Sequence, residues 1–533
     1  MRRKWKQKWM LLFTLSLSLS LAACGSSGPK EAKNPEPQTN QKESGKEPLN
    51  IEWLTYQYGP VDDDAPNKKF LEDKFNVKFN IWYLDVTKRE ELLGAKLAGG
   101  QVPDFMTVYS GADLQKFFKS GVTTGFTQEE LEQYMPNYKK LVDSIDPKIW
   151  NYAKFNGQYI GIPSINGDGE YSLATAWRKD WLDKVGISKI PETLDEFEEA
   201  IYKFRNNDPD GNGKKDTYGM SRSAMTSIYG AYGVYPEFWT ERDGKLVWGG
   251  ILPETKQALE RLAKWKKDDV ISPEWVLENG ENTGGYWATS NDFVNGKIGV
   301  SNHGMNYHWT PPIPEIKSDG GVNYVETKKA NPKAEIGFGK PPVGPDGKFG
   351  NITPGYVGGT YMAFGKKTAD NPELKHTIMK IWDEVYGNFD VWQRMKYGEL
   401  GVQYEKAEDG ITIVWKEEYA GKNDMQAKIG ANITFAPFDQ PEFRARVTNP
   451  KLKEINSKLY KFEGAGYENA LKTALPSEGQ YMNSLVQLQK ETFAAIINRE
   501  KTIDQFDAFV EAWKQSGGDK LTEEANQWYE SLK

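Results

Sequence analysis

The sequence predicts an α/β protein with at least two domains. Runs typical of β-strands alternate along the chain with runs whose apolar residues recur at helical spacing. Two tight turns, at Asn156-Gly157 and Asp243-Gly244, join short strand-like runs and are typical of β-hairpins. The chain has 533 residues. A single hydrophobic core stops growing at roughly 250–300 residues, so more than one domain is expected.

The N-terminus predicts an export signal over residues 1–23, followed by a lipid-attachment site. Five basic residues among the first eight precede a mostly apolar run over 10–21. This run is shorter than the ~20 residues that a membrane-spanning helix needs. It ends in Leu-Ala-Ala-Cys24, which resembles a bacterial lipobox, and Cys24 is the only cysteine. A diacylglycerol on Cys24 supplies the two acyl chains that stable anchoring requires, so we expect a lipid anchor at the extracellular face of the cell membrane. The alternative is a secreted protein with a chance cysteine.

Residues 24–48 predict a flexible tether, because they contain no large apolar side chain. The first strand-like run, Leu49–Tyr58, follows at once. Loss of the five basic residues with the signal changes the formal net charge from −7 to about −12. So acidic a body disfavours nucleic acid as a partner. With one cysteine, a disulfide framework and a thiolate metal site are excluded.

Three helices can be placed from their starting residues and apolar spacing. The starts are marked by Thr193 with Glu196 as a capping box, by Asn371 with Pro372, and by Thr502 with Gln505 as a cap. The second helix carries Trp382 on its apolar face and the third carries Trp513. Both tryptophans are therefore expected in the core.

One loop has the residue pattern of a calcium-binding EF-hand loop. Oxygen-bearing groups recur at alternate positions, and Gly213 stands sixth, where such a loop turns sharply. The expected ligands are Asp208, Asp210, Asn212, the carbonyl group of Lys214, and Asp216. Gly219 replaces the bidentate glutamate at position twelve. We therefore expect a structural calcium site with a dissociation constant of about 10⁻⁴ to 10⁻³ M. The alternative is an ordinary Asp/Asn/Gly turn.

Seven short runs carry a family resemblance through their order along the chain. They are residues 156–163, 176–182, 191–197, 208–216, 292–300, 358–365 and 397–404. Together they resemble the large sugar-binding lipoproteins of Gram-positive ABC importers, within the family 1 extracellular solute-binding proteins. The loop at 208 also resembles that of alginate-binding members. The resemblance covers essentially the whole mature chain.

The resemblance implies a two-lobe fold of the periplasmic-binding-protein type (type II), with a ligand cleft and a hinge between the lobes. Lobe 1 would comprise 49–172 and 358–440, and lobe 2 would comprise 173–357 with most of the C-terminal helices over 441–533. The chain would cross near 173–178 and near 358–363. Gly358-Gly359 suits a hinge there, or a tight turn. Such a protein captures an oligosaccharide by lobe closure and delivers it to the permease of an ABC transporter, and we expect it to act as a monomer.

The aromatic content, 13 % with 18 Trp, independently favours a carbohydrate ligand. Aromatic planes cover the C–H faces of sugars, and polar groups bond the hydroxyls. Candidate contact residues in polar or glycine-rich loops are Tyr56, Tyr58, Tyr109, Ser110, Trp287, His303, Asn306, Tyr307, Tyr356 and Tyr481. The run 301–307 also matches where maltodextrin-binding proteins place a ligand-stacking aromatic. For each residue the alternative is ordinary packing. Arg178 and Lys179 could meet a uronate or face solvent.

Few residues support an enzyme. Of the three histidines, His303 and His308 lie in a loop-like run without zinc-site spacing, and His376 is expected on the solvated side of a helix. There is no Gly-x-Ser-x-Gly nucleophile elbow. Carboxylate pairs for glycoside cleavage remain possible. The alternatives to a non-enzymatic binding protein are a surface glycoside hydrolase or polysaccharide lyase, and a carbohydrate-binding adhesin or sensor.

Overall fold

The computed structural model describes residues 47–55, 57–84, 88–167, 169, 171–277, 290–314, 318–353 and 359–532. Residues 48–533 form one compact unit, separate from residues 1–47. The predicted signal, Cys24 and nearly all of the predicted tether therefore lie outside the described residues. Among the helices of the described ranges, none is both long and apolar enough to cross a membrane.

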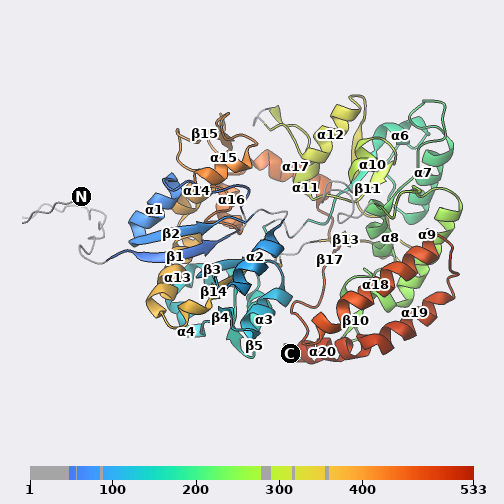
Figure 1. Cartoon of the computed structure of the whole chain (residues 1–533). Coiled ribbons are helices and arrows are strands. Elements are labelled where there is room, and N and C mark those ends of the chain that lie inside the picture. The colour runs from blue at the N-terminus through green and yellow to red at the C-terminus, as the bar shows by residue number, and fades with distance from the viewer. Residues whose placement is uncertain are drawn as a thin grey trace, which may run out of the picture. The chain divides into compact units, whose positions relative to one another are not determined.

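The first sheet is a mixed sheet with the strand order β2-β1-β3-β14-β4, and β7 also pairs with β14. Its strands are β1 (Leu49–Leu54), β2 (Val77–Trp82), β3 (Phe105–Val108), β4 (Thr123–Thr124), β7 (Ile162–Pro163) and β14 (Tyr361–Gly365). β1 runs parallel to β2 and β3. β14 arrives from far along the sequence and runs antiparallel to β3, with Tyr361 opposite Val108. One sheet is thus built from two distant parts of the chain (Figure 1).

Helices from both parts of the chain cover this sheet. They are α1 (Pro66–Phe75), α2 (Arg89–Ala98), α3 (Gly111–Lys119), α4 (Gln128–Tyr134), α5 (Pro136–Ile145), α13 (Pro372–Gly387), α14 (Phe389–Tyr397), α15 (Asn423–Lys428) and α16 (Pro441–Arg446). The core between sheet and helices is aromatic: the Phe105 ring lies 4.8 Å from Trp53, 5.0 Å from Phe364 and 5.4 Å from Trp382. Trp382 is fully buried, as predicted.

A second sheet, with the order β11-β8-β12, is antiparallel throughout. Its strands are β8 (Thr175–Arg178), β11 (Val300–Ser301) and β12 (Ile336–Gly339). The surrounding helices are α6 (Lys179–Lys184), α7 (Leu194–Asn206), α8 (Met225–Ala231), α9 (Pro253–Lys267), α10 (Asn291–Val294), α11 (Asn306–Trp309), α12 (Val322–Ala330), α17 (Pro450–Tyr460), α18 (Glu478–Ile497), α19 (Gln505–Trp513) and α20 (Asp519–Glu530). In Figure 1 the red helices α18–α20 gather beside α9 and β10, and α18 packs directly on α9.

Short two-stranded pairs complete the fold. They are β5 (Lys154–Phe155) with β6 (Gln158–Tyr159), β9 (Trp239–Arg242) with β10 (Lys245–Trp248), β15 (Tyr404–Lys406) with β16 (Ile413–Trp415), and β13 (Asn351–Ile352) with β17 (Gly466–Tyr467). The first two pairs are the predicted hairpins. Their turns have positive φ at both central residues, 49° and 80° for Asn156-Gly157 and 51° and 76° for Asp243-Gly244, which is the conformation that Asn-Gly and Asp-Gly favour.

Two of the three predicted helix starts are confirmed. The capping box of Thr193 and Glu196 is formed at α7, and the Asn371 side chain caps α13. The predicted cap at Thr502 is wrong, because α19 begins after Asp504 and no side chain caps it. The Gln505 N–H instead donates to the backbone carbonyl of Thr502, so a backbone turn satisfies this helix end.

The C-terminal part of the chain belongs to both cores. Phe443 of α16 and Val447 pack in the core of the first sheet. Tyr460 of α17 packs in a cluster with Trp309, beside the second sheet, and its ring lies 5.1 Å from Phe338. We propose that the chain leaves lobe 1 after Val447, rather than at 440 as the sequence suggested.

Replacement of Gly230 by alanine is expected to destabilise the protein. Gly230 lies in α8, and a Cβ there would overlap the carbonyl group of Gly350, just before β13. Gly230→Ala should lower the free energy of unfolding by about 1–3 kcal/mol, measured by urea or thermal denaturation. The matched control is Gly94→Ala in α2, where no atom lies within 4 Å. It should leave stability unchanged or raise it by about 0.5–1 kcal/mol. Equal loss in both variants would contradict the tight contact at α8.

Candidate functional site

Two large cavities lie among the described residues. One, of about 870 Å³, lies over α7 and α9. The other, of about 760 Å³, has walls from α8, α18 and the segments next to β11 and β13. The volume of both suits a small ligand, so the chemistry of their walls must distinguish them.

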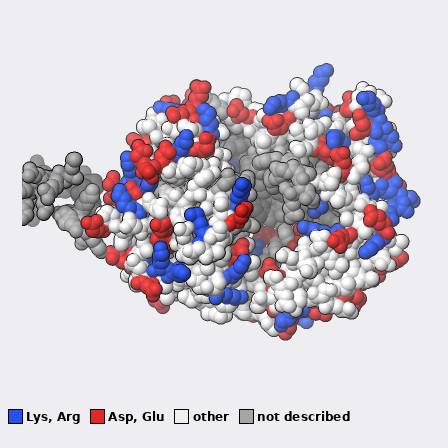
Figure 2. All heavy atoms as spheres, in the orientation of Figure 1, with Lys and Arg blue, Asp and Glu red and all other residues white. Residues whose placement is uncertain are grey.

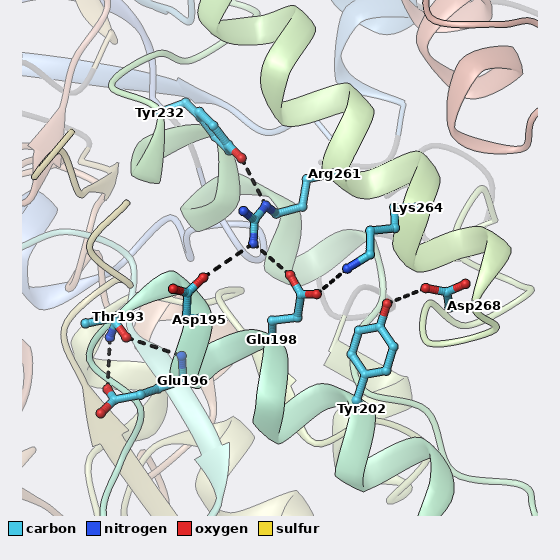
Figure 3. A network of polar contacts seen from close by, with 9 residues as sticks. All are labelled: Thr193, Asp195, Glu196, Glu198, Tyr202, Tyr232, Arg261, Lys264 and Asp268. Carbon is cyan, nitrogen blue, oxygen red and sulfur yellow. Dashed lines mark hydrogen bonds and ion pairs between the residues drawn. The ribbon is translucent and has the colours of Figure 1, made fainter. Parts of the chain in front are cut away.

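The charges of the first cavity are already paired with one another. Arg261 donates to Glu198 at 2.7 Å and to the Tyr232 hydroxyl at 3.0 Å, and Lys264 also donates to Glu198 (Figure 3). Burial opposes ionisation of Glu198, but its hydrogen bonds and the two cations outweigh this effect and lower its pKa. Figure 3 shows these side chains joining α7 to α9. The network therefore stabilises the packing of α7 against α9. Its main cations, Arg261 and Lys264, are already paired with Glu198, so neither requires a charged ligand.

The second cavity lies beside both chain connections between the sheets. Residues 164–174 connect β7 to β8, and the chain returns from β13 to β14 after residue 352. Leu173 and Ile352, from these two connections, both line the cavity. The Leu173 N–H donates to the Ile352 carbonyl oxygen at 2.8 Å. A molecule in this cavity therefore contacts the segments through which one sheet is joined to the other.

Aromatic side chains form much of the cavity wall. They are Tyr229, Tyr235, Trp275 and Phe493. The Trp275 indole N–H donates to Asn498 at 3.1 Å, which fixes that ring in place. Burial raises the pKa of Tyr229 and of Tyr235, so both hydroxyls stay protonated at neutral pH. The wall thus offers flat apolar faces together with neutral hydroxyl groups.

Asn302 and His303 follow β11 and also line the cavity. The Asn302 amide donates to Thr175 at 2.7 Å and accepts from Ser227 at 2.6 Å, so it joins β8 to α8. His303 Nδ1 lies 2.7 Å from the Ser290 hydroxyl. Burial lowers the pKa of His303 to about 4, so its imidazole is neutral at physiological pH. The polar groups at this end of the cavity are therefore held in place and uncharged.

The charged residues of the wall differ in burial. Glu237, Lys490 and Glu491 are exposed, whereas Arg222 is partly buried. Arg222 lies in the 3₁₀ segment Arg222–Ala224 that leads into α8. Its guanidinium makes no hydrogen bond and no ion pair with the residues that the structure describes.

Of the candidate residues that the structure describes, His303 is the one found on this wall. Tyr109 lines a much smaller cavity at the ends of β1 and β3, where the Arg89 guanidinium lies 3.4 Å from the centre of its ring. Tyr58, 43 % exposed, lies close to that end of β1 along the chain. Gln57, which sequence reasoning missed, also lines the smaller cavity; it is buried, and its amide has no hydrogen-bond partner in the described part of the chain.

The other described candidates either make contacts within the fold or lie away from the two large cavities. Ser110 caps α3 by accepting from the Asp113 N–H at 3.0 Å. Asn306 is buried in α11, Tyr307 is 52 % exposed, and Tyr481 packs against the second core. Tyr56, Trp287 and Tyr356 lie outside the described residues.

Two expectations about charged side chains are wrong. Arg178 is neither solvent-facing nor free for a ligand, because it is buried and donates twice to Asp180, at 2.9 and 2.6 Å. His376 is not a solvated side chain: its ring stacks on Tyr134 at 3.9 Å and its Nε2 lies 2.9 Å from Glu130. The partner of Arg178 lies only two residues along the chain, whereas Tyr134 and Glu130, which position His376, are far from it in the sequence. Lys179 pairs with Asp183.

Arg222 and the two cavity tyrosines were also missed from sequence. Arg222 stands between two serines, and Tyr229 and Tyr235 flank the run Gly-Ala-Tyr-Gly-Val. A run of this kind has no helical or strand periodicity. Its two glycines were the only sign in the sequence that two backbone segments approach each other closely at this point.

In the loop at 208–216, three backbone N–H groups converge on one carboxylate. Asp208 accepts hydrogen bonds from the N–H groups of Gly211, Asn212 and Gly213, each at 3.1 Å. Desolvation opposes ionisation of Asp208, but these hydrogen bonds outweigh it and lower its pKa. Desolvation and the carboxylates of Asp216 and Asp208 raise the pKa of Asp210. The loop therefore concentrates negative charge.

The residues of this loop fit a cation only after a rearrangement. Within the described residues no group of three or more His, Cys, Asp or Glu side chains is placed to hold a metal ion. The Asn212 amide nitrogen donates to Asp210 at 2.8 Å and to Asp216 at 3.1 Å, so a donor joins the two carboxylates. Rotation of that amide would present its oxygen to the same space. At Gly219 a Cβ would overlap Ile201 of α7, which explains why no glutamate occupies the twelfth position.

Comparison with known proteins gives consistent results. A family model described as a bacterial extracellular solute-binding protein matches residues 67–374. The polygalacturonan/rhamnogalacturonan-binding protein YtcQ of Bacillus subtilis strain 168 is 26 % identical, with 100 % of each chain covered. Lipoprotein LipO of the same organism is 22 % identical, again over 100 % of each chain. The crystal structure of alginate-binding protein AlgQ2 without calcium ion superimposes with a TM-score of 0.64, at 17 % identity, covering 92 % of this chain and 100 % of that one.

Proposed function

Because the chain belongs to the bacterial extracellular solute-binding proteins, we propose that it captures an oligosaccharide outside the cell and delivers it to the permease of an ABC importer. The 760 Å³ cavity carries this proposal. Its aromatic and neutral hydroxyl groups suit the alternating C–H faces and hydroxyls of a sugar. The carbohydrate named for the relative YtcQ supports the same ligand class.

The position of the cavity suggests how ligand capture is coupled to a change of shape. Leu173 and Ile352 belong to both the cavity wall and the connections between the sheets. Hinge residues of two-domain binding proteins are a few positions in such connections. A ligand held against them therefore biases the angle between the lobes, and the permease would distinguish the closed form from the open one. We further infer that the sugar is bound and released unchanged, by a single chain acting as a monomer.

Loss of an aromatic wall is expected to weaken sugar binding. Tyr235→Ala removes a ring that lines the cavity and should reduce affinity a few-fold to about tenfold. Binding can be followed by tryptophan fluorescence and by the rise in melting temperature across a panel of oligosaccharides. Tyr83→Ala, an exposed tyrosine after β2, is the control and should bind as the wild type does. Chromatography should recover the sugar intact; catalytic conversion would refute a pure binding function.

We propose that the loop at 208–216 binds calcium in a structural role, through Asp208, Asp210, Asn212, the Lys214 carbonyl and Asp216. The cation would be surrounded by oxygen ligands and would neutralise the clustered carboxylates. The loop directly follows α7, one of the helices around the second sheet. Bound calcium would therefore hold the end of that helix and the chain leading to Gly219.

Calcium should raise the melting temperature, and chelation should lower it. Asp210→Asn is expected to remove this response, because it deletes one carboxylate of the proposed ligand set while keeping its shape. Asp243→Asn, in the turn between β9 and β10, alters an aspartate of similar sequence context and should retain the full response. If chelation leaves the wild-type melting curve unchanged, the loop is an ordinary turn.

We also propose that Cys24 carries a lipid anchor on the extracellular face of the cell membrane, as the lipobox and the lipoprotein relative LipO support. The anchor needs two acyl chains, because one alone binds a bilayer reversibly. Cys24→Ser should move the protein from the membrane fraction and the detergent phase into the culture medium. Release of the wild-type protein to the same extent would refute the anchor.

A further inference from the structure

Arg222 lines the proposed binding cavity and is partly buried on its wall, together with Tyr229 and Tyr235. Burial and the negative charge of Glu237 raise the pKa of both tyrosines, and the positive charge of Arg222 lowers it against that rise. Neither tyrosine is ionised at neutral pH, so neither balances this charge.

Other buried or partly buried arginines of the second lobe have carboxylate partners. Arg178 pairs with Asp180, Arg205 with Asp269 and Arg261 with Glu198. Arg222 has none among the described residues. Removal of a guanidinium from water without a partner is costly, and proteins ordinarily avoid it. Within the described part of the chain, the guanidinium is therefore left available for a charged group that enters the cavity.

The remaining charges of the wall do not replace such a partner. Glu237, Lys490 and Glu491 are all exposed, where water and salt screen them. Glu491 also accepts a hydrogen bond from Gln487 at 2.7 Å. His303 is neutral, and Asn302 is held by Thr175 and Ser227. Arg222 is therefore the partly buried charge of the described cavity wall, and Glu237 opposes it from an exposed position.

We propose that Arg222 is the specificity-determining residue of this cavity and that its ligand is an acidic oligosaccharide whose uronate carboxylate pairs with the guanidinium. This inference rests on the proposed function. A planar guanidinium matches a carboxylate in two parallel hydrogen bonds, which a sugar hydroxyl cannot reproduce. The tyrosine rings beside Arg222 exclude water and strengthen the pair.

The test compares one saccharide in charged and uncharged form. Trigalacturonate and its fully methyl-esterified form are titrated against the wild-type protein by calorimetry at low and physiological salt. The charged form should bind about 10- to 100-fold more tightly, and its affinity should fall with salt. Arg222→Gln should remove that difference, Arg222→Lys should retain part of it, and the exposed Arg499→Gln should behave as the wild type does.

The outcomes distinguish the role of Arg222 from the capture of a sugar. Equal affinity for the acid and its ester, or an equal loss of both in Arg222→Gln, would overturn the role of Arg222 while leaving sugar capture in place. Tighter binding of neutral kestose or maltotriose than of trigalacturonate would do the same. If no charged or neutral saccharide binds at all, sugar capture and the inference fail together. A melting curve for each variant confirms that it is folded.

Discussion

The pairing of β14 with β3 is the constraint on which the rest of the structure depends. Residues 361–365 return to the first sheet after the whole of the second sheet has been built, and Tyr361 lies opposite Val108 in a fixed register. β14 also pairs with β4 and β7. Because the side-chain period of a strand is two residues, a shift by one would turn Phe364 out of the core. Two of the connections between the lobes, before β8 and after β13, follow directly from this arrangement.

Those connections place the binding chemistry. Leu173 and Ile352 both line the aromatic cavity, and a hydrogen bond from the Leu173 N–H to the Ile352 carbonyl oxygen joins the two connections. The cavity wall is held by polar contacts that are already satisfied, such as Asn302 with Thr175 and Ser227. Arg222, on the same wall, has no carboxylate partner among the residues that the structure describes. In the same lobe, by contrast, the cations Arg261 and Lys264 are both paired with Glu198.

Charged side chains of both signs lie on the surface of the protein. On the face shown in Figure 2, basic and acidic side chains are interspersed. The chain nevertheless has a formal net charge of −7 before any processing. An acidic ligand therefore approaches a body of its own sign. A local cation inside the cavity would be needed to overcome that repulsion, which makes the position of Arg222 more significant than its single charge suggests.

Sequence patterns predicted the features that depend on neighbouring residues. The turns at Asn156-Gly157 and Asp243-Gly244, the capping box at Thr193 and the burial of Trp382 and Trp513 all follow from local spacing. Single site residues were harder to predict. Arg178 pairs with Asp180, two residues along the chain, but its full burial depends on three-dimensional packing, as does the place of Arg222 on a cavity wall. The resemblance to a family identified the fold class but gave no position for Tyr229, Tyr235 or Gln57.

The late arrival of β14 also has a consequence for how the protein folds. A chain is synthesised from its N-terminus, so β1, β2 and β3 exist well before residues 361–365. Until then the edge of β3 that β14 will cover is an unpaired strand edge, a known site of aggregation. Completion of the first sheet must wait for the second, which makes slow, non-local assembly outside the cell an intrinsic property of this topology.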